Sequence, residues 1–378
     1  MPWRVPLADL DYGEAEQAAV MDVLRSRWLT MGAVTRELEQ RFAALVGVRH
    51  AVAVSSATAA LHLACLALDI GPGDEVIVPS LSFVATANAV RYTGAQVRFA
   101  DVIGPHDLTV SPASIRAQIT PRSKAIIVMH YAGFPCRMPE IVRIARQHGL
   151  AVIEDAAHAP GARLDGTALG AWGEAGCFSF FSNKNLATGE GGMLVTDREE
   201  IARQARLLRS HGMTTLSWDR HQGHAHSYDV VGLGYNYRID EIRAALGLAQ
   251  LDKLARNNAR RRAITLEYRR QLAGLPVELP FQDAAGEPAY HIFPILLPPG
   301  ADRADFIERM HTAGIQTSIH YPPIHRFRLY HRRHAQVSLP ITDDVTRREV
   351  TLPLYPTMRA EDVSAVVAAV RGSLKDRG

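Results

Sequence analysis

The sequence predicts an α/β protein in which a mostly parallel central sheet carries helices on both faces and is followed by a smaller C-terminal α+β domain. This prediction rests on two features. Between residues 50 and 155, short apolar segments alternate with segments whose apolar residues recur at helical spacing, as in sheets with crossover helices. After residue 290 the order changes to strand, helix, strand and a closing helix. Because 378 residues exceed the usual limit of one core, we expect two domains, 1–250 and 251–378.

Residues that typically begin or end helices set the bounds of most predicted elements. Gly47 ends the second helix, Ser111 with Pro112 begins another, and the sequence GPGDE closes the helix that starts after SSAT. Apolar runs without alternation indicate strands buried on both faces. The expected helices are 14–26, 34–46, 57–68, 83–93, 112–119, 138–148, 198–209, 239–272, 302–313 and one from Ala360; the expected strands are 50–54, 75–78, 96–100, 124–129, 151–155, 175–181, 193–196, 290–296 and 315–319.

Composition excludes several classes of function. The 42 basic and 39 acidic residues are spread along the chain, so we expect no nucleic-acid partner. The arginines of 252–270 form the one locally basic segment, which is predicted to be a solvated helix face. Cys65, Cys136 and Cys177 each lie in an apolar segment and are expected to be buried thiols. The N-terminus lacks the apolar core of a signal peptide and no window is long enough to span a membrane, so we expect a cytoplasmic protein.

Lys184 is the first candidate for chemistry. It lies between an apolar strand and a turn formed by Gly189, Gly191 and Gly192. An ammonium group is costly to desolvate, so a lysine in apolar surroundings at a strand end is expected to have a lowered pKa or a covalent partner. A surface lysine extending from a loop is the alternative interpretation.

Two further candidates precede this lysine in the chain. Residues 55–59, SSATA, place free amides and hydroxyls in the first turn of a helix, an arrangement that binds phosphate, although the same residue types also cap helices without any ligand. Asp155 ends the strand AVIED, and open α/β sheets bind ligands at such strand ends; a helix cap or a turn is its other interpretation. No G-x-G-x-x-G follows an early strand, which argues against a nicotinamide cofactor.

Pyridoxal phosphate needs all three of these features, namely a lysine amine, a carboxylate for the pyridine nitrogen and donors for the phosphate. In this order the chain resembles the fold-type-I pyridoxal-phosphate enzymes. More closely, it is similar to the DegT/DnrJ/EryC1/StrS sugar aminotransferases. The blocks that carry the likeness span nearly the whole chain: SSATAALHLACLAL, GPGDEVIVPSLSFVATANAV, IEDAAHAPGA, FSFFSNKNLATGEGGM, GYNYRIDEIRAALGLAQL and IHYPPIH.

The resemblance implies roles for individual residues. Lys184 would be the Schiff-base lysine, Asp155 the partner of the pyridinium nitrogen and Phe83, otherwise expected in the core, an aromatic lid on the ring. His158 would lie near the ring. The implied phosphate contacts are Ala57, Thr58, Ala59 and Ser179, with Asn236 reaching the phosphate of the neighbouring subunit in a homodimer. The substrate would contact Thr30, Arg238, His320 and Tyr321.

Two departures from the family pattern narrow the resemblance. Many members have Gly where this chain has Ala57, and Gln where it has His158. Both variants look like those of the 4-amino-4-deoxyarabinose branch, as does, faintly, the sequence WDR at 218–220. The implied activity is transfer of an amino group, with glutamate as the expected donor, to a nucleotide-linked sugar, with a 4-keto sugar as the expected acceptor; pyridoxamine phosphate would form on the way.

Other activities stay open at this point. The same chemistry could act on a cyclitol or another small ketone, and a non-catalytic ligand-binding regulator is a third interpretation. Lys184 argues against the dehydrating relatives, which have His at this position. His211, His221, His224 and His226 lie in a polar stretch without carboxylate or cysteine companions, so we expect exposed side chains and no metal site.

Overall fold

A seven-stranded sheet forms the centre of the protein in a computed structural model that describes residues 3–214, 227–334 and 336–374. The sheet runs in the order β1 (His50–Val54), β11 (Gly192–Thr196), β10 (Ala175–Ser179), β7 (Ala151–Asp155), β6 (Ser123–Met129), β2 (Glu75–Pro79) and β3 (Gln96–Ala100). Only β11 runs antiparallel to its neighbours, while the pairs β10–β7, β7–β6, β6–β2 and β2–β3 are parallel. The mostly parallel sheet expected from the alternation is therefore confirmed.

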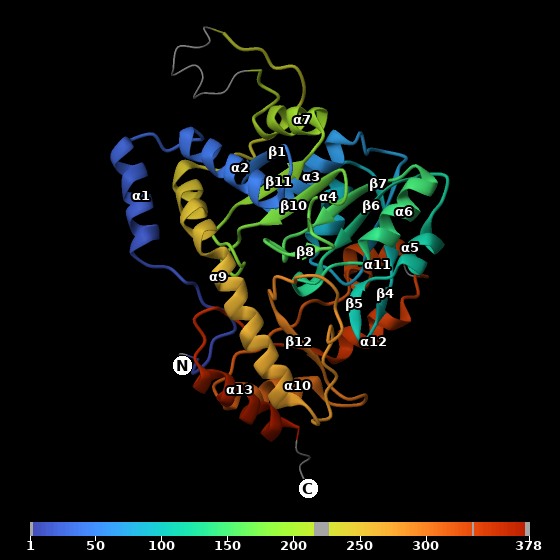
Figure 1. The fold of residues 1–378 in the computed structure, drawn as a ribbon. Coiled ribbons are helices and arrows are strands. Elements are labelled where there is room, and N and C mark those ends of the chain that lie inside the picture. The colour runs from blue at the N-terminus through green and yellow to red at the C-terminus, as the bar shows by residue number, and fades with distance from the viewer. Residues whose placement is uncertain (1–2, 215–226, 335, 375–378) are drawn as a thin grey trace.

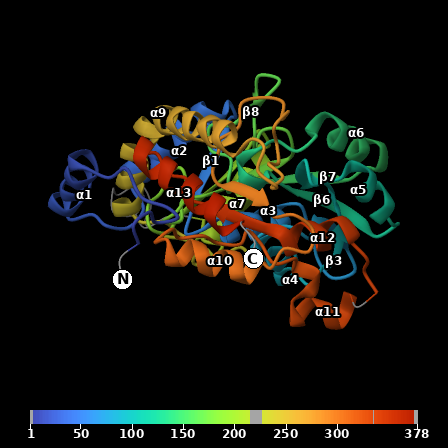
Figure 2. The same cartoon turned by 90° about the horizontal axis from the view of Figure 1, so that it is seen from below.

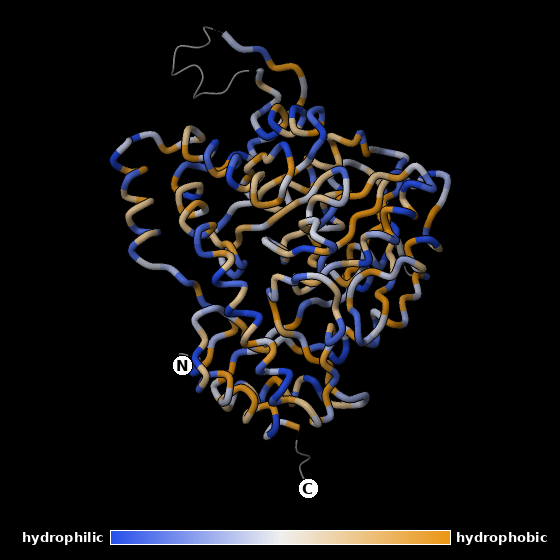
Figure 3. The backbone as a smooth tube through the Cα atoms, viewed as in Figure 1, coloured by the Kyte–Doolittle hydropathy of each residue, from blue (hydrophilic) through white to orange (hydrophobic). Residues whose placement is uncertain are grey.

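Helices cover both faces of this sheet, and Figure 2 shows the strands lying between the two layers. One face packs against α3 (Ala57–Ala67), α4 (Ala85–Tyr92) and α7 (Glu199–Arg209). The other packs against α2 (Ala33–Val46), α5 (Pro112–Gln118), α6 (Met138–His148) and the first part of α9 (Glu241–Leu272), and α1 (Glu14–Ser26) lies against α9. Apolar colour concentrates along the strands in Figure 3, as the uninterrupted apolar runs predict.

The C-terminal part builds a separate core around two antiparallel strands, β12 (Phe293–Leu296) and β13 (Glu349–Leu352). Helices α10 (Arg303–Thr312) and α13 (Ala360–Ser373) and the last turns of α9 complete it. Figure 1 shows α9 running from the large sheet to this core, so the boundary expected near residue 250 lies inside one continuous helix. Smaller elements are α11 (Arg328–His334), α12 (Pro340–Arg348), β4 (Val102–Gly104), β5 (Asp107–Val110), β8 (Arg163–Leu164), β9 (Thr167–Ala168) and the 3₁₀ turns Tyr131–Gly133 and Ile324–Arg326.

Most element bounds agree with the sequence prediction, and the exceptions lie mainly in the C-terminal part. The strand expected at 315–319 is wrong, because this segment makes only single bridges, from Ile315 to Val5 and from Ser318 to Thr351. The strand expected at 290–296 begins only at Phe293. The backbone before it bonds elsewhere: the His291 amide donates to the Ala132 carbonyl over 2.8 Å.

Three predictions about side chains can be compared with the structure. All three cysteines are buried free thiols, as expected. Arg261 departs from the predicted solvated face of α9, since it is 3% exposed and donates to two backbone carbonyls. His211 is exposed as expected, whereas His221, His224, His226 and the sequence at 218–220 lie outside the described residues. In the described part of the chain, none of the helices combines the length and the apolar character needed to cross a membrane.

Candidate active site

Lys184 lies on a folded loop that joins β10 to β11. Its amide donates to the Phe181 carbonyl over 2.9 Å, and Phe180 exchanges backbone bonds with Gly191 and Thr188 across the loop. Gly189 has a φ of 83°, a left-handed conformation that favours glycine. These bonds fix the loop against the end of the strand. The half-buried Lys184 side chain consequently starts from a rigid base.

Asp155 ends β7, the strand next to β10, and pairs in register with Cys177. Its carboxylate accepts from the Thr86 hydroxyl over 2.7 Å and from the Ala157 amide over 3.2 Å. Burial raises the pKa of Asp155 above its ordinary value, and these hydrogen bonds and the Lys184 charge act in the opposite direction.

The environment also changes the acidity of the lysine. Burial lowers the pKa of Lys184 to about 8, partly offset by the negative charge of Asp155. This is the shift expected from the apolar surroundings of the sequence. A lysine with such a pKa is a free amine in about a tenth of molecules at pH 7, against fewer than about one in a thousand for an ordinary lysine, which suits a nucleophile or a proton carrier.

The N-terminus of α3 lies beside the same sheet edge. Ser56 caps the helix by accepting from the Ala59 amide over 3.1 Å, and the first bond within the helix runs from the Ala60 amide to the Ser56 carbonyl. The amides of Ala57 and Thr58 precede that bond, so they are free to donate to an anion. A Cβ at Gly192 would lie 2.6 Å from the Ala57 nitrogen, so β11 approaches this turn as closely as glycine allows.

Buried histidines close the other side of Lys184. The Ala132 amide donates to His158 Nδ1 over 3.3 Å, so His158 Nε2 carries the proton and donates to the Tyr321 hydroxyl over 2.9 Å. Burial lowers the pKa of His158 well below its ordinary value, and that of His320 to about 4, with the Lys184 charge adding to both shifts. The histidines are therefore neutral. The described residues contain no group of three or more His, Cys, Asp or Glu able to hold a metal ion.

The carboxyl group of Glu349 holds His320 in place, directly and through Thr351. Glu349 accepts from the His320 amide over 2.9 Å and shares a 2.5 Å contact with the Thr351 hydroxyl, which in turn lies 2.9 Å from His320 Nδ1. Burial raises the pKa of Glu349 to about 8. The Tyr131 hydroxyl donates to the His320 carbonyl, which fixes the backbone of this segment as well.

His291 also belongs to this cluster, although the sequence analysis gave it no role. It is 3% exposed, its Nε2 lies 3.4 Å from Lys184 Nζ, and its ring centroid lies 4.2 Å from that of His158. Arg261, the buried arginine of α9, donates to its carbonyl over 3.1 Å. Nothing local in the sequence marks this residue, since it precedes an apolar strand 107 positions after the lysine.

The structure brings some predicted residues together and leaves others apart. Phe83 is 55% exposed, which contradicts a place in the core, and its ring centroid lies 5.8 Å from that of Tyr321. Ser179 is buried at the end of β10 and accepts from the Phe181 amide. Within the described residues, no hydrogen bond or ring contact joins the side chains of Thr30, Asn236 or Arg238 to the cluster around Lys184. Thr30 and Asn236 are exposed.

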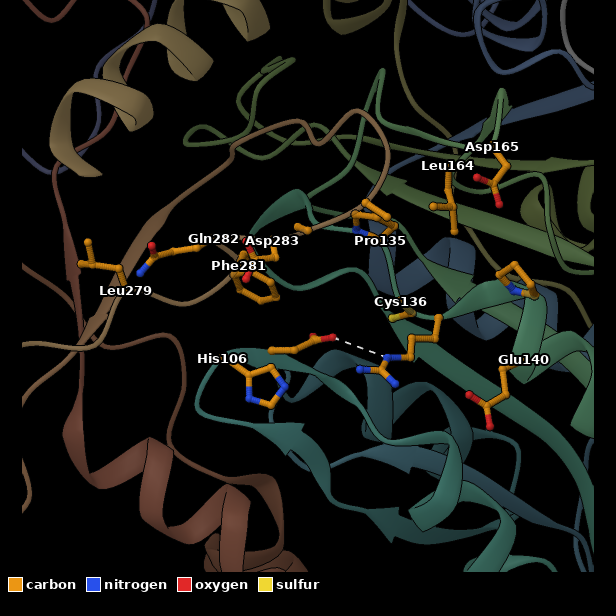
Figure 4. Close-up of a pocket in the computed structure, with 15 residues that line it drawn as sticks. His106, Pro135, Cys136, Glu140, Leu164, Asp165, Leu279, Phe281, Gln282 and Asp283 are labelled. Carbon is orange, nitrogen blue, oxygen red and sulfur yellow. Dashed lines mark ion pairs between the residues drawn. The ribbon is translucent and has the colours of Figure 1, made fainter. Parts of the chain in front are cut away.

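A cavity of about 750 Å³ lies elsewhere on the molecule, between residues 135–140 and residues 279–285. Its lining includes Asp107 and Arg137, whose ion pair measures 3.9 Å and is the dashed line in Figure 4. None of the site residues predicted from the sequence lines this cavity. Its size alone does not make it the active site, because the titratable residues with strongly shifted pKa values lie around Lys184 instead.

Comparison with known proteins shows the family to which this chain belongs. The model of the DegT/DnrJ/EryC1/StrS aminotransferase family matches residues 10–371. The chain belongs to that family. Aminotransferase TlmJ from Streptoalloteichus hindustanus is 33% identical with a TM-score of 0.91 over 98% of each chain, and DesV from S. venezuelae is 35% identical with a TM-score of 0.91 over 100% of each. PseC from Helicobacter pylori, an aminotransferase of pseudoaminic acid biosynthesis, is 28% identical with a TM-score of 0.90 over 98% of this chain and 99% of its own.

The protein is thus a pyridoxal-phosphate-dependent aminotransferase with the type I fold, and its relatives include sugar aminotransferases. A sugar aminotransferase of Streptococcus pneumoniae has been described in forms with pyridoxal phosphate and with pyridoxamine phosphate. The residues of this aminotransferase fit that cofactor. A lysine amine of lowered pKa, a buried carboxylate on the adjacent strand and free amides at a helix N-terminus converge on one sheet edge.

Proposed function

We propose that this aminotransferase transfers an amino group from glutamate to the keto group of a nucleotide-linked sugar, at a 4-keto position. The observation that carries the proposed chemistry is that Lys184 follows β10 while the buried Asp155 ends the adjacent strand β7, close enough for each charge to shift the pKa of the other. The sugar is supported by the family and by relatives named as sugar aminotransferases, such as CalS13 from Micromonospora echinospora. Ala57 and His158 resemble the 4-amino-4-deoxyarabinose branch, which favours a 4-keto acceptor.

Bound pyridoxal phosphate would supply an aldehyde carbon and a pyridinium ring that accepts electrons. Asp155 would hold the proton on the ring nitrogen, and its burial strengthens that interaction. The amides of Ala57 and Thr58, with Ser179, would hold the phosphate, and Phe83 would cover the ring. Nζ of Lys184 would take a proton from the carbon that bears the donor's amino group and return it to the cofactor carbon.

A Lys184→Ala substitution tests the central assignment. We expect loss of the absorbance that arises when a lysine amine binds the cofactor, together with loss of turnover by at least about 10³-fold. Lys253→Ala, which removes a lysine distant in sequence and paired with Glu16, serves as the control for a lost ammonium group. Wild-type turnover in the Lys184 variant would disprove the role.

The substrate is tested separately from the chemistry. The purified enzyme is first mixed with glutamate or glutamine, and the conversion of the cofactor is followed by absorbance. The aminated form is then offered a panel of UDP-, dTDP- and GDP-linked 4-keto sugars. Consumption of one nucleotide sugar supports the proposal, whereas reaction only with a cyclitol ketone would favour the alternative acceptor.

We further propose a homodimer in which Asn236 of each subunit reaches the phosphate in the other, acting in the cytoplasm. Apolar side chains exposed in this chain, Leu29, Phe181, Val231 and Leu233, support a partner surface, and Asn236 is itself exposed. Light scattering gives the oligomeric state. Mixed dimers of Lys184→Ala and Asn236→Ala subunits should each contain one intact site, so mixing at limiting cofactor should restore about one quarter of wild-type activity; no gain on mixing would exclude a shared site.

A further inference from the structure

His291 contacts Lys184 directly and has no part in the proposed mechanism. Its Nε2 lies 3.4 Å from Lys184 Nζ. In the described part of the chain this is the one hydrogen-bond contact found for that ammonium. Asp155 also acts on Lys184 through its charge, without a hydrogen bond to it. The contact therefore places one ring nitrogen of His291 against the reactive amine.

A chain of side-chain amides fixes the proton of the imidazole. Asn258 Nδ2 donates to the Pro160 carbonyl over 2.9 Å, so its oxygen faces Asn185. Asn185 Nδ2 donates to that oxygen over 2.8 Å and to the Ala289 carbonyl over 2.7 Å. Both donor positions of Asn185 are thereby used, which leaves its oxygen as an acceptor.

The tautomer of His291 follows from this chain. His291 Nδ1 lies 2.9 Å from Asn185 Oδ1, which can only accept, so Nδ1 carries the proton. Burial lowers the pKa of His291 well below its ordinary value, and the charges of Lys184 and Arg261 and the neighbouring rings of His158 and His320 act in the same direction. The ring is therefore neutral. Its Nε2 lone pair faces the lysine.

We propose that His291 is a positioning residue whose Nε2 accepts a hydrogen bond from Lys184 Nζ, holding the free lysine in a fixed direction while it carries its proton. The proposal rests on the proposed role of Lys184. The backbone of His291 is held by Ala132 and Arg261, and its ring by Asn185, so the acceptor is rigid. Because the lone pair favours the charged amine, it offsets part of the desolvation of Lys184.

Two substitutions separate the two ring nitrogens. In His291→Gln the terminal amide group reaches the position of Nε2 and can still accept from Lys184. In His291→Asn the shorter amide reaches only the position of Nδ1, so it can donate to Asn185 but cannot contact the lysine. The pair is matched in polarity and differs in the contact under test.

The readout is the pKa of Lys184 in the cofactor-free full-length protein, measured by pH-dependent acetylation and mass spectrometry. We expect His291→Asn to lower this pKa by about one unit, as loss of a hydrogen bond to a charged group predicts. His291→Gln should leave it near the wild-type value. An unchanged or raised pKa in His291→Asn, or an equal fall in both variants, would overturn the proposal.

The loaded enzyme provides a second readout. His291 contacts the lysine and not a substrate, so His291→Asn should lower kcat with little change in KM, and His291→Gln should restore kcat. If a variant does not fold, the tautomer can still be tested in the wild-type protein. The ¹⁵N chemical shifts of His291 should then show a protonated Nδ1 and an unprotonated Nε2. A protonated Nε2 could not accept from Lys184 and would contradict the proposal.

A failure of the proposed lysine role has a different signature. If Lys184→Ala still bound the cofactor covalently, the function assigned to the lysine would be wrong, whatever its pKa. If Lys184→Ala behaved as expected but neither His291 variant moved the lysine pKa, only the positioning role would fall.

Discussion

Two regions of the molecule meet at Lys184 and differ in how they are built. On one side, Asp155 at the end of β7 supplies a carboxylate, and Ala57 and Thr58 at the start of α3, just after β1, supply free amides. On the other side, His291, His320 and Tyr321 come from the segments around the C-terminal core.

The two regions also differ in charge. Asp155 can balance a positive charge, whereas the histidines opposite are held neutral by burial. The neutral histidines do not compensate the burial of Lys184, so its pKa stays low. The Asp155 carboxylate keeps that pKa from falling further. The sheet edge therefore sets the electrostatics of the site, and the C-terminal segments set its hydrogen-bond directions.

Of the changes that separate the two regions, Asp155→Asn should have the largest effect, because it removes the charge of the sheet-edge region. We expect kcat to fall roughly 10²–10³-fold, as for loss of a preorganised electrostatic partner. Steady-state kinetics with a saturating donor measures it. Thr86→Val removes a hydrogen bond to Asp155 and keeps the charge, so it should cost less. Comparable losses in the two variants would show that hydrogen bonding, and not charge, distinguishes this region.

Gly192→Ala tests the phosphate side of the same region. The new Cβ would lie 2.5 Å from the Ser56 carbonyl carbon, so the N-terminus of α3 must shift. Overpacking of about 1–3 kcal/mol corresponds to a loss of pyridoxal-phosphate affinity of roughly tenfold to a hundredfold. Titration of the cofactor-free protein measures it. Gly372→Ala, at a helix position with no atom within 4 Å of the new Cβ, is the control and should bind normally.

Tyr321→Phe tests the region opposite. It removes the hydroxyl that accepts from His158 Nε2, which leaves a buried donor unpaired. The free energy of unfolding should fall by about 1–3 kcal/mol, measured by urea denaturation. Tyr92→Phe, at a ring that is 56% exposed, should change stability little. Equal effects at the two tyrosines would mean that the His158 contact is not maintained in solution.

The smallest expected effect concerns Glu349 and pH. Its pKa of about 8 in the folded protein exceeds that of an unfolded glutamate, about 4.3, so the folded state holds the proton that the unfolded state has lost between these values. This group therefore makes stability decrease as pH rises through that window. Glu349→Gln mimics the protonated form, so its stability relative to wild type should increase from pH 6 to pH 7 by about 1 kcal/mol. A constant difference would place the pKa of Glu349 outside the window.

The sequence predicted the elements and site residues of the sheet-edge region better than those of the C-terminal region. The strand ending in Asp155 and the capped start of α3 have local signals, because apolar runs and capping residues act within a few positions. The segment around residue 315 carries the same apolar pattern but pairs only through single bridges with Val5 and Thr351. Its partners are remote in sequence, so local pattern could not reveal that no continuous ladder forms.

Arg261 and His291 show the same limit for side chains. Arg261 lies in a basic run that indicates a solvated face, yet it is buried because two carbonyls of the C-terminal part accept its hydrogen bonds. His291 has no motif of its own. Its importance to Lys184 arises from an amide chain through Asn185 and Asn258, and no spacing along the sequence predicts such a chain.

The sequence by itself determined the alternating α/β order, the strand ends that carry Asp155 and the glycine-bounded loop of Lys184, because these follow from hydrophobic periodicity and backbone preferences over short distances. Only the tertiary structure decided which neutral groups face the lysine and which atom of His291 accepts from it. Hydrogen-bond direction and desolvation depend on partners that folding brings together from 100 or more positions away.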